Sequence, residues 1–536
     1  MHPSLLGFIA AAFVSSTVAV PFYDETDTSV APLITPPAPP TGGPLSHLAV
    51  QGGHSPADHL IKDNYIVVFK KGLKEYEVRT HKDQVYQLWK EDSEQRLQSS
   101  SFGIEDLFSG IKHHFDLGSN LFQGYSIHVP AALISFIRRL PGVDYVERDT
   151  RVWINEPFFQ HTTVPAQESS HEVDVEYGAP WGLARISHRH KLKFSTFNVY
   201  PFEDPAGKGV DVYVIDTGVN IDHVELGGRA KWGKTIPDDP DKDLNGHGSH
   251  VAGTIASTTY GVAKNATIIA VKVLGAGGSG TMSDVIAGVV WAAETAAVKA
   301  RDEANKKDSK HKGSVANMSL GGGKSPSLDQ AVNAAVDTGL HFAVAAGNDN
   351  RDACTFSPAA ASKPITVGAS TIQDERAYFS NHGKCVDIFA PGLAIKSIWN
   401  TGPRSVNTIS GTSMASPHIA GLAAYFLSIY PQHLDLSALG ISEEEDEDLT
   451  APNGEAYDLR QYFSWNSVTS QGQLALGKFQ ESVGFGNVPR NTNDGVKILS
   501  TRALKKAMIK MSTSGVLTEL PEQTCNYLAF NNATLA

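Results

Sequence analysis

The chain is poor in cysteine, in long apolar runs and in net positive charge. Its 536 residues contain three cysteines, Cys354, Cys385 and Cys525, which is few for a secreted protein. Beyond the N-terminal region no apolar run reaches the roughly 18–20 residues that span a bilayer, so we expect no membrane span. Asp and Glu outnumber Lys and Arg, 57 to 45, and the net charge of -12 disfavours nucleic acid or an anionic membrane as the main partner.

The N-terminus has the features of a secretory signal peptide over residues 1–19. Leu5 to Val14 is a short apolar stretch, and Thr17-Val18-Ala19 supplies small residues for cleavage. No Lys or Arg precedes the stretch, and a short buried helix is the alternative interpretation. The signal predicts a mature protein that is soluble in a secretory or vacuolar lumen.

Three segments with different patterns follow the signal. Residues 20–62 are rich in Pro, Gly, Ser and Thr and indicate a flexible leader. Residues 63–155 have the order strand, helix, strand, helix, strand, which predicts a small α+β module. Residues 156–178 have the composition of a linker. The candidate elements of the module are strands at 65–69, 125–129 and 143–147 and helices around Leu88 and Leu133.

Strands and helices alternate from residue 179 onward. This alternation predicts an α/β fold with a mostly parallel sheet and helices on both faces. Residues 432–495 include six consecutive acidic residues and indicate a disordered insertion, with a docking segment as the alternative. The candidate strands are 212–215, 268–273, 315–318 and 342–346, and the candidate helices are 282–300, 328–338 and 504–511.

Two candidate catalytic residues lie in separate motifs of this region. Asp216 directly follows the apolar strand at 212–215, and functional groups in open α/β sheets lie at the carboxyl ends of strands. His247 lies in the run Asn245-Gly246-His247-Gly248-Ser249-His250. Each has a simpler alternative, since Asp216 suits a turn and two histidines three apart also suit a metal. We assign His247 as a base and His250 a structural role.

Ser413 is the third candidate, in the run Gly411-Thr412-Ser413-Met414-Ala415. A helix of small residues follows, so Ser413 lies near a helix N-terminus, where the helix dipole favours developing negative charge. An N-cap serine is the alternative. A serine hydroxyl needs a base, and the base needs a carboxylate that fixes its tautomer, so the three residues make sense together. The order Asp, His, Ser is the order of subtilisin, and the serine motif is not the elbow of an ester hydrolase.

These segments together resemble the subtilisin superfamily of serine endopeptidases, in its proteinase K branch, with the cerevisin group of fungal vacuolar proteases as the nearest likeness. The resemblance implies a three-layer fold over residues 179–536 and a ferredoxin-like inhibitor propeptide over 63–155. It also implies a maturation cleavage within 156–178, a monomer, and no cofactor for catalysis. Further matching segments are Val271-Lys272-Val273-Leu274, Asn317 to Gly323, Ala345 to Asp349, Asp387 to Gly392 and Ala179 to Ile186.

The resemblance also assigns roles to other residues. Asn348 is expected to donate to the oxyanion, and a disulfide is expected between Cys354 and Cys385. Small residues suggest a roomy primary pocket, and therefore a preference for large apolar side chains before the cleaved bond. The expected substrate-binding residues are Gly277, Gly278, Ser279 and Gly280 on one strand, Ser319, Leu320, Gly321 and Gly322 on another, and Ala345, Ala346 and Gly347 at the pocket.

Three features concern departures and modifications. Val251 stands where many relatives have cysteine, so the thiol sensitivity of those relatives is not expected. Asp387, with carbonyls near Ser362 and Pro364, resembles a structural calcium site of some relatives, although a single carboxylate is a weak calcium ligand set. Asn265 and Asn532 fit the glycan acceptor pattern; Asn317 fits as well but lies in a predicted strand.

The sequence therefore predicts a self-processing protease precursor that acts on proteins and peptides. Its own propeptide is expected to block the cleft until maturation. The likeness to the cerevisin group favours the vacuole lumen, with secretion as the alternative. Two rival functions remain at this point: an inactive family member that only binds, and a serine hydrolase that acts on esters.

Overall fold

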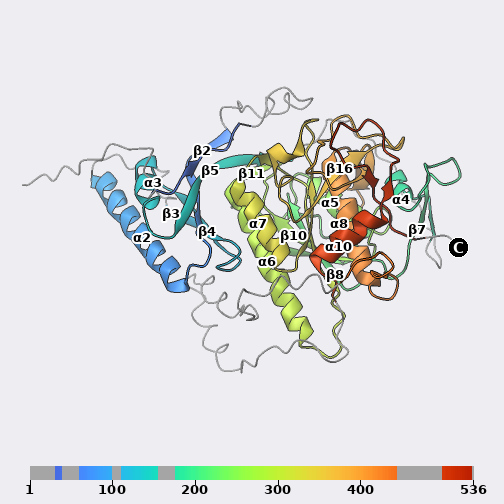
Figure 1. Ribbon diagram of the computed structural model, residues 1–536, viewed down its shortest axis with the longest axis horizontal. Coiled ribbons are helices and arrows are strands. Elements are labelled where there is room, and N and C mark those ends of the chain that lie inside the picture. Colours follow the sequence, from blue (N-terminus) through green and yellow to red (C-terminus); the bar gives the residue numbers. More distant parts are fainter. Residues whose placement is uncertain (1–29, 39–58, 99–109, 155–174, 443–497, 534–536) are drawn as a thin grey trace, which may run out of the picture.

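The computed structural model describes residues 30–38, 59–98, 110–154, 175–442 and 498–533 (Figure 1). The signal peptide predicted at 1–19 lies outside these residues, as does the acidic run of the insertion. A smaller N-terminal unit packs against a larger α/β unit. None of the helices among the described residues is both long enough and apolar enough to cross a membrane.

The smaller unit is a sheet with two helices on its outer face, in the chain order β2-α2-β3-β4-α3-β5. This is the ferredoxin-like arrangement that the sequence predicted, with one more strand than the pattern indicated. The additional strand, β3, carries Lys112 and His113, which pair with Asp284 of the larger unit. These polar residues interrupt the alternation of apolar and polar residues by which a strand is recognised in the sequence. The elements are β2 (Leu60–Phe69), α2 (Glu75–Gln98), β3 (Gly110–Asp116), β4 (Gln123–His128), α3 (Ala131–Ile137) and β5 (Val143–Trp153).

Part of the expected flexible leader belongs to this sheet. Strand β1 (Leu33–Ile34) pairs in parallel with β5, at Val146 and Glu147. Ala31 is buried nearby, and its backbone N–H donates to the Arg138 carbonyl at 3.0 Å. The prediction of a flexible leader is therefore wrong for this stretch, because pairing satisfies its backbone groups.

The larger unit is built on a nine-stranded sheet in which neighbouring strands are parallel except for the last pair, β20 and β21. The four candidate strands predicted from apolar runs form its centre. In spatial order the strands are β20 (Thr513–Ser514), β21 (Tyr527–Leu528), β17 (Ile388–Pro391), β16 (Ile365–Ser370), β14 (His341–Ala345), β12 (Gly313–Met318), β8 (Val210–Asp216), β10 (Thr267–Lys272) and β9 (Ala230–Thr235).

Helices cover both faces of this sheet, which confirms the predicted three-layer α/β fold (Figure 1). Residues of β8 alternate between the faces: Val212 and Val214 pack with α5 and α8, and Tyr213 and Ile215 with α6 and α7. The helices are α5 (His247–Ala256) and α8 (Thr412–Ile429) on one face, with α10 (Thr501–Met511) against α8, and α6 (Met282–Ala304) and α7 (Pro326–Asp337) on the other.

Shorter elements join these layers. Strand β6 lies within the linker predicted at 156–178, and residues 432–442 of the predicted insertion bury Leu434, Leu436 and Ile441 in the core. Both segments are therefore more ordered than the sequence indicated. The shorter elements are β6 (Val175–Tyr177), α4 (Trp181–Ile186), β7 (Val199–Pro201), η3 (Val224–Leu226), β11 (Ser279–Thr281), β13 (Gly322–Gly323), η4 (Ala353–Thr355), β15 (Phe356–Ser357), β18 (Ile395–Ile398) and β19 (Val406–Ile409).

The two units meet at the N-termini of α6 and α7. Asp149 of β5 accepts from the backbone N–H and the hydroxyl of Ser283, at 3.1 and 2.6 Å. Glu147 accepts from the backbone N–H and the hydroxyl of Ser327, at 3.0 and 2.7 Å. A carboxylate at a helix N-terminus satisfies unpaired N–H groups and complements the helix dipole. The smaller unit therefore supplies caps that hold two helices of the larger unit.

Candidate active site

Asp216 and His247 form a buried pair at the carboxyl edge of the large sheet. Asp216 is the last residue of β8, and His247 is the first residue of α5. Nδ1 of His247 lies 2.7 Å from Oδ1 of Asp216, and neither side chain is exposed. The Thr217 backbone N–H also donates to this oxygen, at 2.7 Å. Because the carboxylate faces Nδ1, it favours the tautomer in which Nε2 can accept a proton.

Asp243 holds the loops that carry this pair, and the sequence analysis missed it. Its Oδ1 accepts from the Thr217 hydroxyl at 2.9 Å and from the Asn245 and Gly246 N–H groups at 3.0 and 2.8 Å. Its Oδ2 accepts from the backbone N–H and the hydroxyl of Ser249, at 3.0 and 2.6 Å. A carboxylate shortly before a helix start is a capping signal that could have revealed it.

Ser413 lies in the first turn of α8, as the motif predicted. The helix is buried along its whole length, and it begins at Thr412. The Ser413 hydroxyl donates to the carbonyl of Ser319 at 3.0 Å, and the Ser319 hydroxyl donates to the carbonyl of Ser413 at 2.9 Å. The Ser413 proton thus points at the predicted substrate strand in this structure. A hydroxyl rotates about its bond at little cost, so it can redirect the proton to a base.

Asn348 is held directly beside the start of α8. Its Oδ1 accepts from the backbone N–H and the hydroxyl of Thr412, at 2.8 and 2.9 Å. The amide oxygen is therefore committed to Thr412, and the NH₂ group points to the opposite side. Such an orientation suits a donor to an oxyanion. The sequence did not predict the contact between Thr412 and Asn348, because 64 residues separate them.

The two predicted substrate strands flank the end of strand β5 of the smaller unit. On one side β11 pairs antiparallel with β5, with Ser279 opposite Trp153 and Gly280 opposite Val152. The Ile154 N–H donates to the Gly278 carbonyl at 2.9 Å. On the other side Trp153 and Gly321 exchange two backbone hydrogen bonds of 3.3 Å each. The structure therefore brings both strands together around a peptide segment of the same chain.

The remaining strand residues have other partners. Gly277 adjoins β11, Leu320 is buried, and Gly322 of β13 pairs with Ser357 of β15.

The predicted pocket residues continue from the end of β14. Ala345 ends the strand, and Ala346 is fully buried, so its side chain packs in the core. Asn381, which the sequence analysis missed, donates to the Ala346 carbonyl at 2.9 Å. Gly347 has φ +102°, and a Cβ there would lie 2.3 Å from the Asn381 amide, so glycine is required. That this turn lines the primary pocket stays a prediction.

His250, the second histidine of the motif, is held by the backbone in the interior of the larger unit. Its Nε2 lies 2.9 Å from the Ile395 carbonyl, and complete burial lowers its pKa to about 3. The ring is therefore neutral and occupies the interior as a structural residue. Within the described ranges no three His, Cys, Asp or Glu side chains cluster as metal ligands.

The structure contains the disulfide between Cys354 and Cys385, with the Cα atoms 5.3 Å apart. Cys525 is a free thiol, and burial raises its pKa to about 12. The side chains of Asn265 and Asn532 are exposed, as a glycan acceptor must be, whereas Asn317 is buried in β12. Glycan attachment stays a prediction.

The oxygens expected to hold calcium face a lysine. Nζ of Lys505 lies 2.8 Å from Oδ2 of Asp387, 2.7 Å from the Pro364 carbonyl and 3.4 Å from the Ser362 carbonyl. Calcium takes six to eight oxygen ligands and would stand beside this ammonium group. These residues therefore do not fit a calcium ion.

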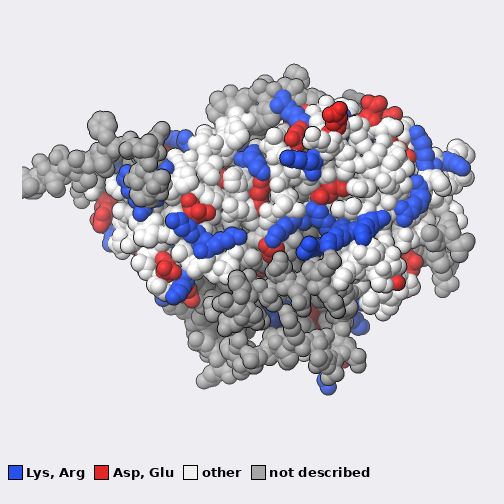
Figure 2. Space-filling view, viewed as in Figure 1, with Lys and Arg blue, Asp and Glu red and all other residues white. Residues whose placement is uncertain are grey.

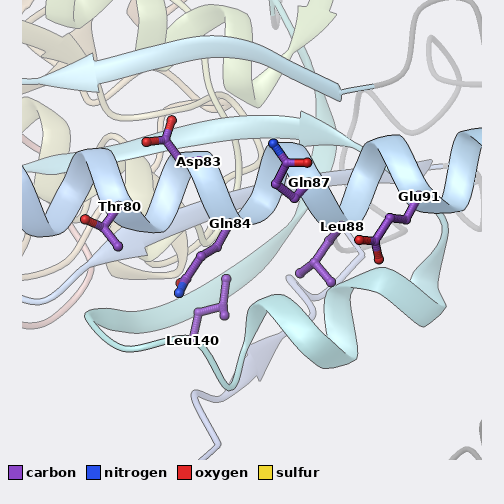
Figure 3. Close-up of a pocket in the computed structure, with 7 residues that line it drawn as sticks. All are labelled: Thr80, Asp83, Gln84, Gln87, Leu88, Glu91 and Leu140. Carbon is purple, nitrogen blue, oxygen red and sulfur yellow. The ribbon is translucent and has the colours of Figure 1, made fainter.

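A hollow elsewhere on the molecule does not belong to this site. It lies on the smaller unit, along one face of α2, and most of the side chains that line it are polar (Figure 3). The lining residues are Thr80, Asp83, Gln84, Gln87, Leu88, Glu91 and Leu140.

Comparison with known proteins decides the family. The model of the subtilase family matches residues 207–486, more than half of the chain, and this range contains Asp216, His247 and Ser413. The chain belongs to the subtilase family. The model of the peptidase inhibitor I9 family matches residues 64–155, which is the smaller unit. The protein is thus a subtilase-family serine endopeptidase built as a zymogen with an inhibitor propeptide.

Curated relatives of this subtilase are fungal proteases. The chain is 47% identical over 475 residues to alkaline protease 2 of Aspergillus fumigatus, covering 88% of this chain and 81% of the relative. It is 46% identical over 517 residues to the subtilisin-like serine protease Pen c 2 of Penicillium citrinum, covering 94% and 95%. It is 56% identical over 375 residues to subtilisin-like protease 8 of Arthroderma benhamiae, covering 69% and 73%.

Proposed function

We propose that Asp216, His247 and Ser413 form the catalytic triad with which this subtilase hydrolyses peptide bonds. The observation that carries the proposal is the buried 2.7 Å contact between Asp216 Oδ1 and His247 Nδ1. This contact leaves Nε2 as the proton acceptor and stabilises the imidazolium that forms when the ring takes a proton. Ser413, at the N-terminus of a buried helix, is the nucleophile.

The reaction is an acyl transfer in two steps. Nε2 of His247 takes the hydroxyl proton as Oγ of Ser413 attacks the peptide carbonyl, and a tetrahedral oxyanion forms. The Asn348 amide and the Ser413 backbone N–H donate to this oxyanion. His247 then gives its proton to the leaving amine, which breaks the C–N bond. Water attacks the acyl-enzyme with His247 again as base, and the carboxyl product leaves Ser413 free.

Substrates bind as an added strand between β11 and the Ser319–Gly321 segment. The propeptide strand β5 already forms this arrangement, with Trp153 between Ser279 and Gly321. Main-chain hydrogen bonds give affinity with little dependence on sequence. Broad specificity follows, with a preference for large apolar side chains before the cleaved bond.

The propeptide is the intramolecular inhibitor of the enzyme. Its strand β5 occupies the place beside β11 where a substrate strand would bind, so substrate cannot enter until the propeptide leaves. Its carboxylates also cap α6 and α7, which holds the propeptide on the enzyme. The protein belongs with the cerevisin group of the proteinase K branch and acts in the vacuole lumen. The signal-like N-terminus and the fungal relatives support a secretory route, and secretion is the second outcome that localisation would reveal.

The test is labelling of the mature enzyme with a fluorophosphonate probe, followed by mass spectrometry of the labelled peptide. We expect the label on Ser413, with Ser413→Ala unlabelled and uncleaved between propeptide and enzyme. Ser437→Ala, which changes an exposed serine, is the matched control and should behave as wild type. Normal maturation and activity of Ser413→Ala would refute the triad. Faster turnover of a lipid ester than of a peptide would favour an ester hydrolase, and an unlabelled mature protein would favour a binding module.

A further inference from the structure

Helix α10 is strongly cationic, and one of its lysines points inward. Its sequence contains Arg502, Lys505, Lys506 and Lys510 and no acidic residue. Figure 2 shows Lys and Arg side chains gathered where Figure 1 places α10. Only about 20% of the Lys505 side chain is exposed, and its ammonium reaches the loops that enter β16 and β17. The Lys505 ammonium is therefore a mostly buried charge that must be balanced by the groups around it.

We propose that the Lys505 ammonium is the built-in cation of the site formed by Asp387 and the carbonyls of Ser362 and Pro364, and that it replaces calcium there. The three oxygens lie 2.8, 3.4 and 2.7 Å from Nζ, in that order. An ammonium group has three N–H donors, so it can direct one at each oxygen. The inference goes beyond the proposed catalytic function and does not depend on it.

The site offers one carboxylate and two carbonyl oxygens, which suit a singly charged ammonium group and not calcium. One carboxylate neutralises one ammonium, and Oδ2 of Asp387 also accepts from the Thr366 N–H at 2.9 Å. Calcium needs six to eight oxygens at about 2.3–2.6 Å, and it would meet the repulsion of the lysine. Because the side chain is covalently attached, its local concentration at the site does not depend on the calcium concentration.

The consequence is that Lys505 connects helix α10 to the loops before β16 and β17. Ser362 and Pro364 precede β16, Asp387 precedes β17, and Lys505 comes from the helix that follows residues 443–497. The single ammonium thus joins two adjacent strands to the C-terminal segment. Stability of this corner of the enzyme should not require calcium.

The experiment measures thermal unfolding of the full-length precursor in a Ser413→Ala background, which prevents self-digestion. Each variant is unfolded with EDTA and with millimolar calcium. Lys505→Gln and Asp387→Asn should each lower the unfolding midpoint by about 5 °C. The double variant should lose less than the sum, because the two residues share one interaction. Arg502→Gln, an exposed change on the same helix, should leave the midpoint unchanged.

Calcium should shift the midpoint equally in the parent and in Asp387→Asn, whatever that shift is. Such an equal shift supports the proposal, because it locates any calcium effect away from Asp387. The proposal is overturned if the parent gains stability from calcium and Asp387→Asn does not. It is also overturned if Lys505→Gln unfolds at the temperature of the parent.

Discussion

Thr412 donates two hydrogen bonds to the Asn348 amide oxygen, from its backbone N–H at 2.8 Å and its hydroxyl at 2.9 Å. The residue that precedes the nucleophile therefore sets the direction of the proposed oxyanion donor. The amide cannot rotate without the loss of both bonds. Because it is fixed before substrate arrives, no reorganisation is needed as the oxyanion develops.

Replacement of Asn348 by Ala should lower kcat about 10²–10³-fold and leave KM nearly unchanged, the magnitude known for such a donor in subtilisin. The donor acts on a charge that exists only in the transition state, so ground-state binding is spared. Steady-state kinetics on a peptide substrate measure both constants. Asn305→Ala, an exposed change at the end of α6 where φ is −85°, is the control. An unchanged kcat in Asn348→Ala would remove the amide from the mechanism.

Asp243 should be a positioning residue of the site. In Asp243→Asn an NH₂ group replaces one carboxylate oxygen and faces N–H donors, and each buried donor left unpaired costs about 1–3 kcal/mol. We expect a lower unfolding midpoint and at least a roughly ten-fold lower kcat, with KM little changed. Asp241→Asn, nearby and exposed, should alter neither. A stable variant with full kcat would show that the network does not orient the pair.

The register of β5 predicts the first bond that the enzyme cuts in itself. Trp153 lies opposite Gly321, and Ile154 is the last described residue of this segment. In antiparallel pairing, two steps forward along one strand match two steps back along the other. The residue two positions after Trp153 is therefore the one that we expect to meet Ser319 when the bond is cut. The Ser319 carbonyl accepts from the Ser413 hydroxyl at 3.0 Å. The expected cut is therefore between Asn155 and Glu156, directly before the range 156–178 in which the resemblance placed it.

Mass spectrometry of rapidly quenched, maturing enzyme should find a first product that begins at Glu156. A second asparagine inserted after Ile154 separates register from sequence preference. If register decides, the cut follows the first asparagine, and the product gains one residue at its N-terminus. A product that still begins at Glu156 would contradict the register argument.

Rising pH should speed release of the propeptide. Burial, and then the nearby Asp116 charge on β3, raise the pKa of Glu294 on α6 to about 7, from a usual 4.5. We expect departure of the propeptide to expose Glu294 and to return its pKa toward 4.5. The stability of the complex is then complete at low pH and falls as the pH rises from about 4.5 to 7. Burial likewise raises the pKa of Asp149 to about 6, which acts in the same direction.

Maturing enzyme held at pH 5 or pH 8, and then assayed at one common pH, measures this effect. We expect activity to appear roughly ten-fold faster at pH 8, after allowance for partial exposure of the carboxyl. Glu294→Gln should reduce that ratio, and Glu303→Gln at the far end of α6 should not. An identical ratio in Glu294→Gln and wild type would exclude this carboxyl as the cause.

The sequence was informative where local pattern reflects burial. The central strands β8, β10, β12 and β14 are apolar because both faces of the sheet are covered, and the motifs at their ends were visible at once. It failed where the partner is distant in the chain. Strand β3 is polar because it meets Asp284, and Lys505 lies 118 residues beyond Asp387. No spacing rule predicts such contacts, since they exist only after the units have packed.

The C-terminal segment completes the edge of the large sheet with β20 and β21, and Asn531 donates through its backbone to Ile186 at 2.7 Å. The one disulfide among the described residues, Cys354–Cys385, lies wholly before residue 443. A nick between 443 and 497 would therefore yield two polypeptides without a covalent link. They would migrate as one particle in gel filtration and as two bands after boiling in detergent, so denaturing electrophoresis alone would understate the mass of working enzyme.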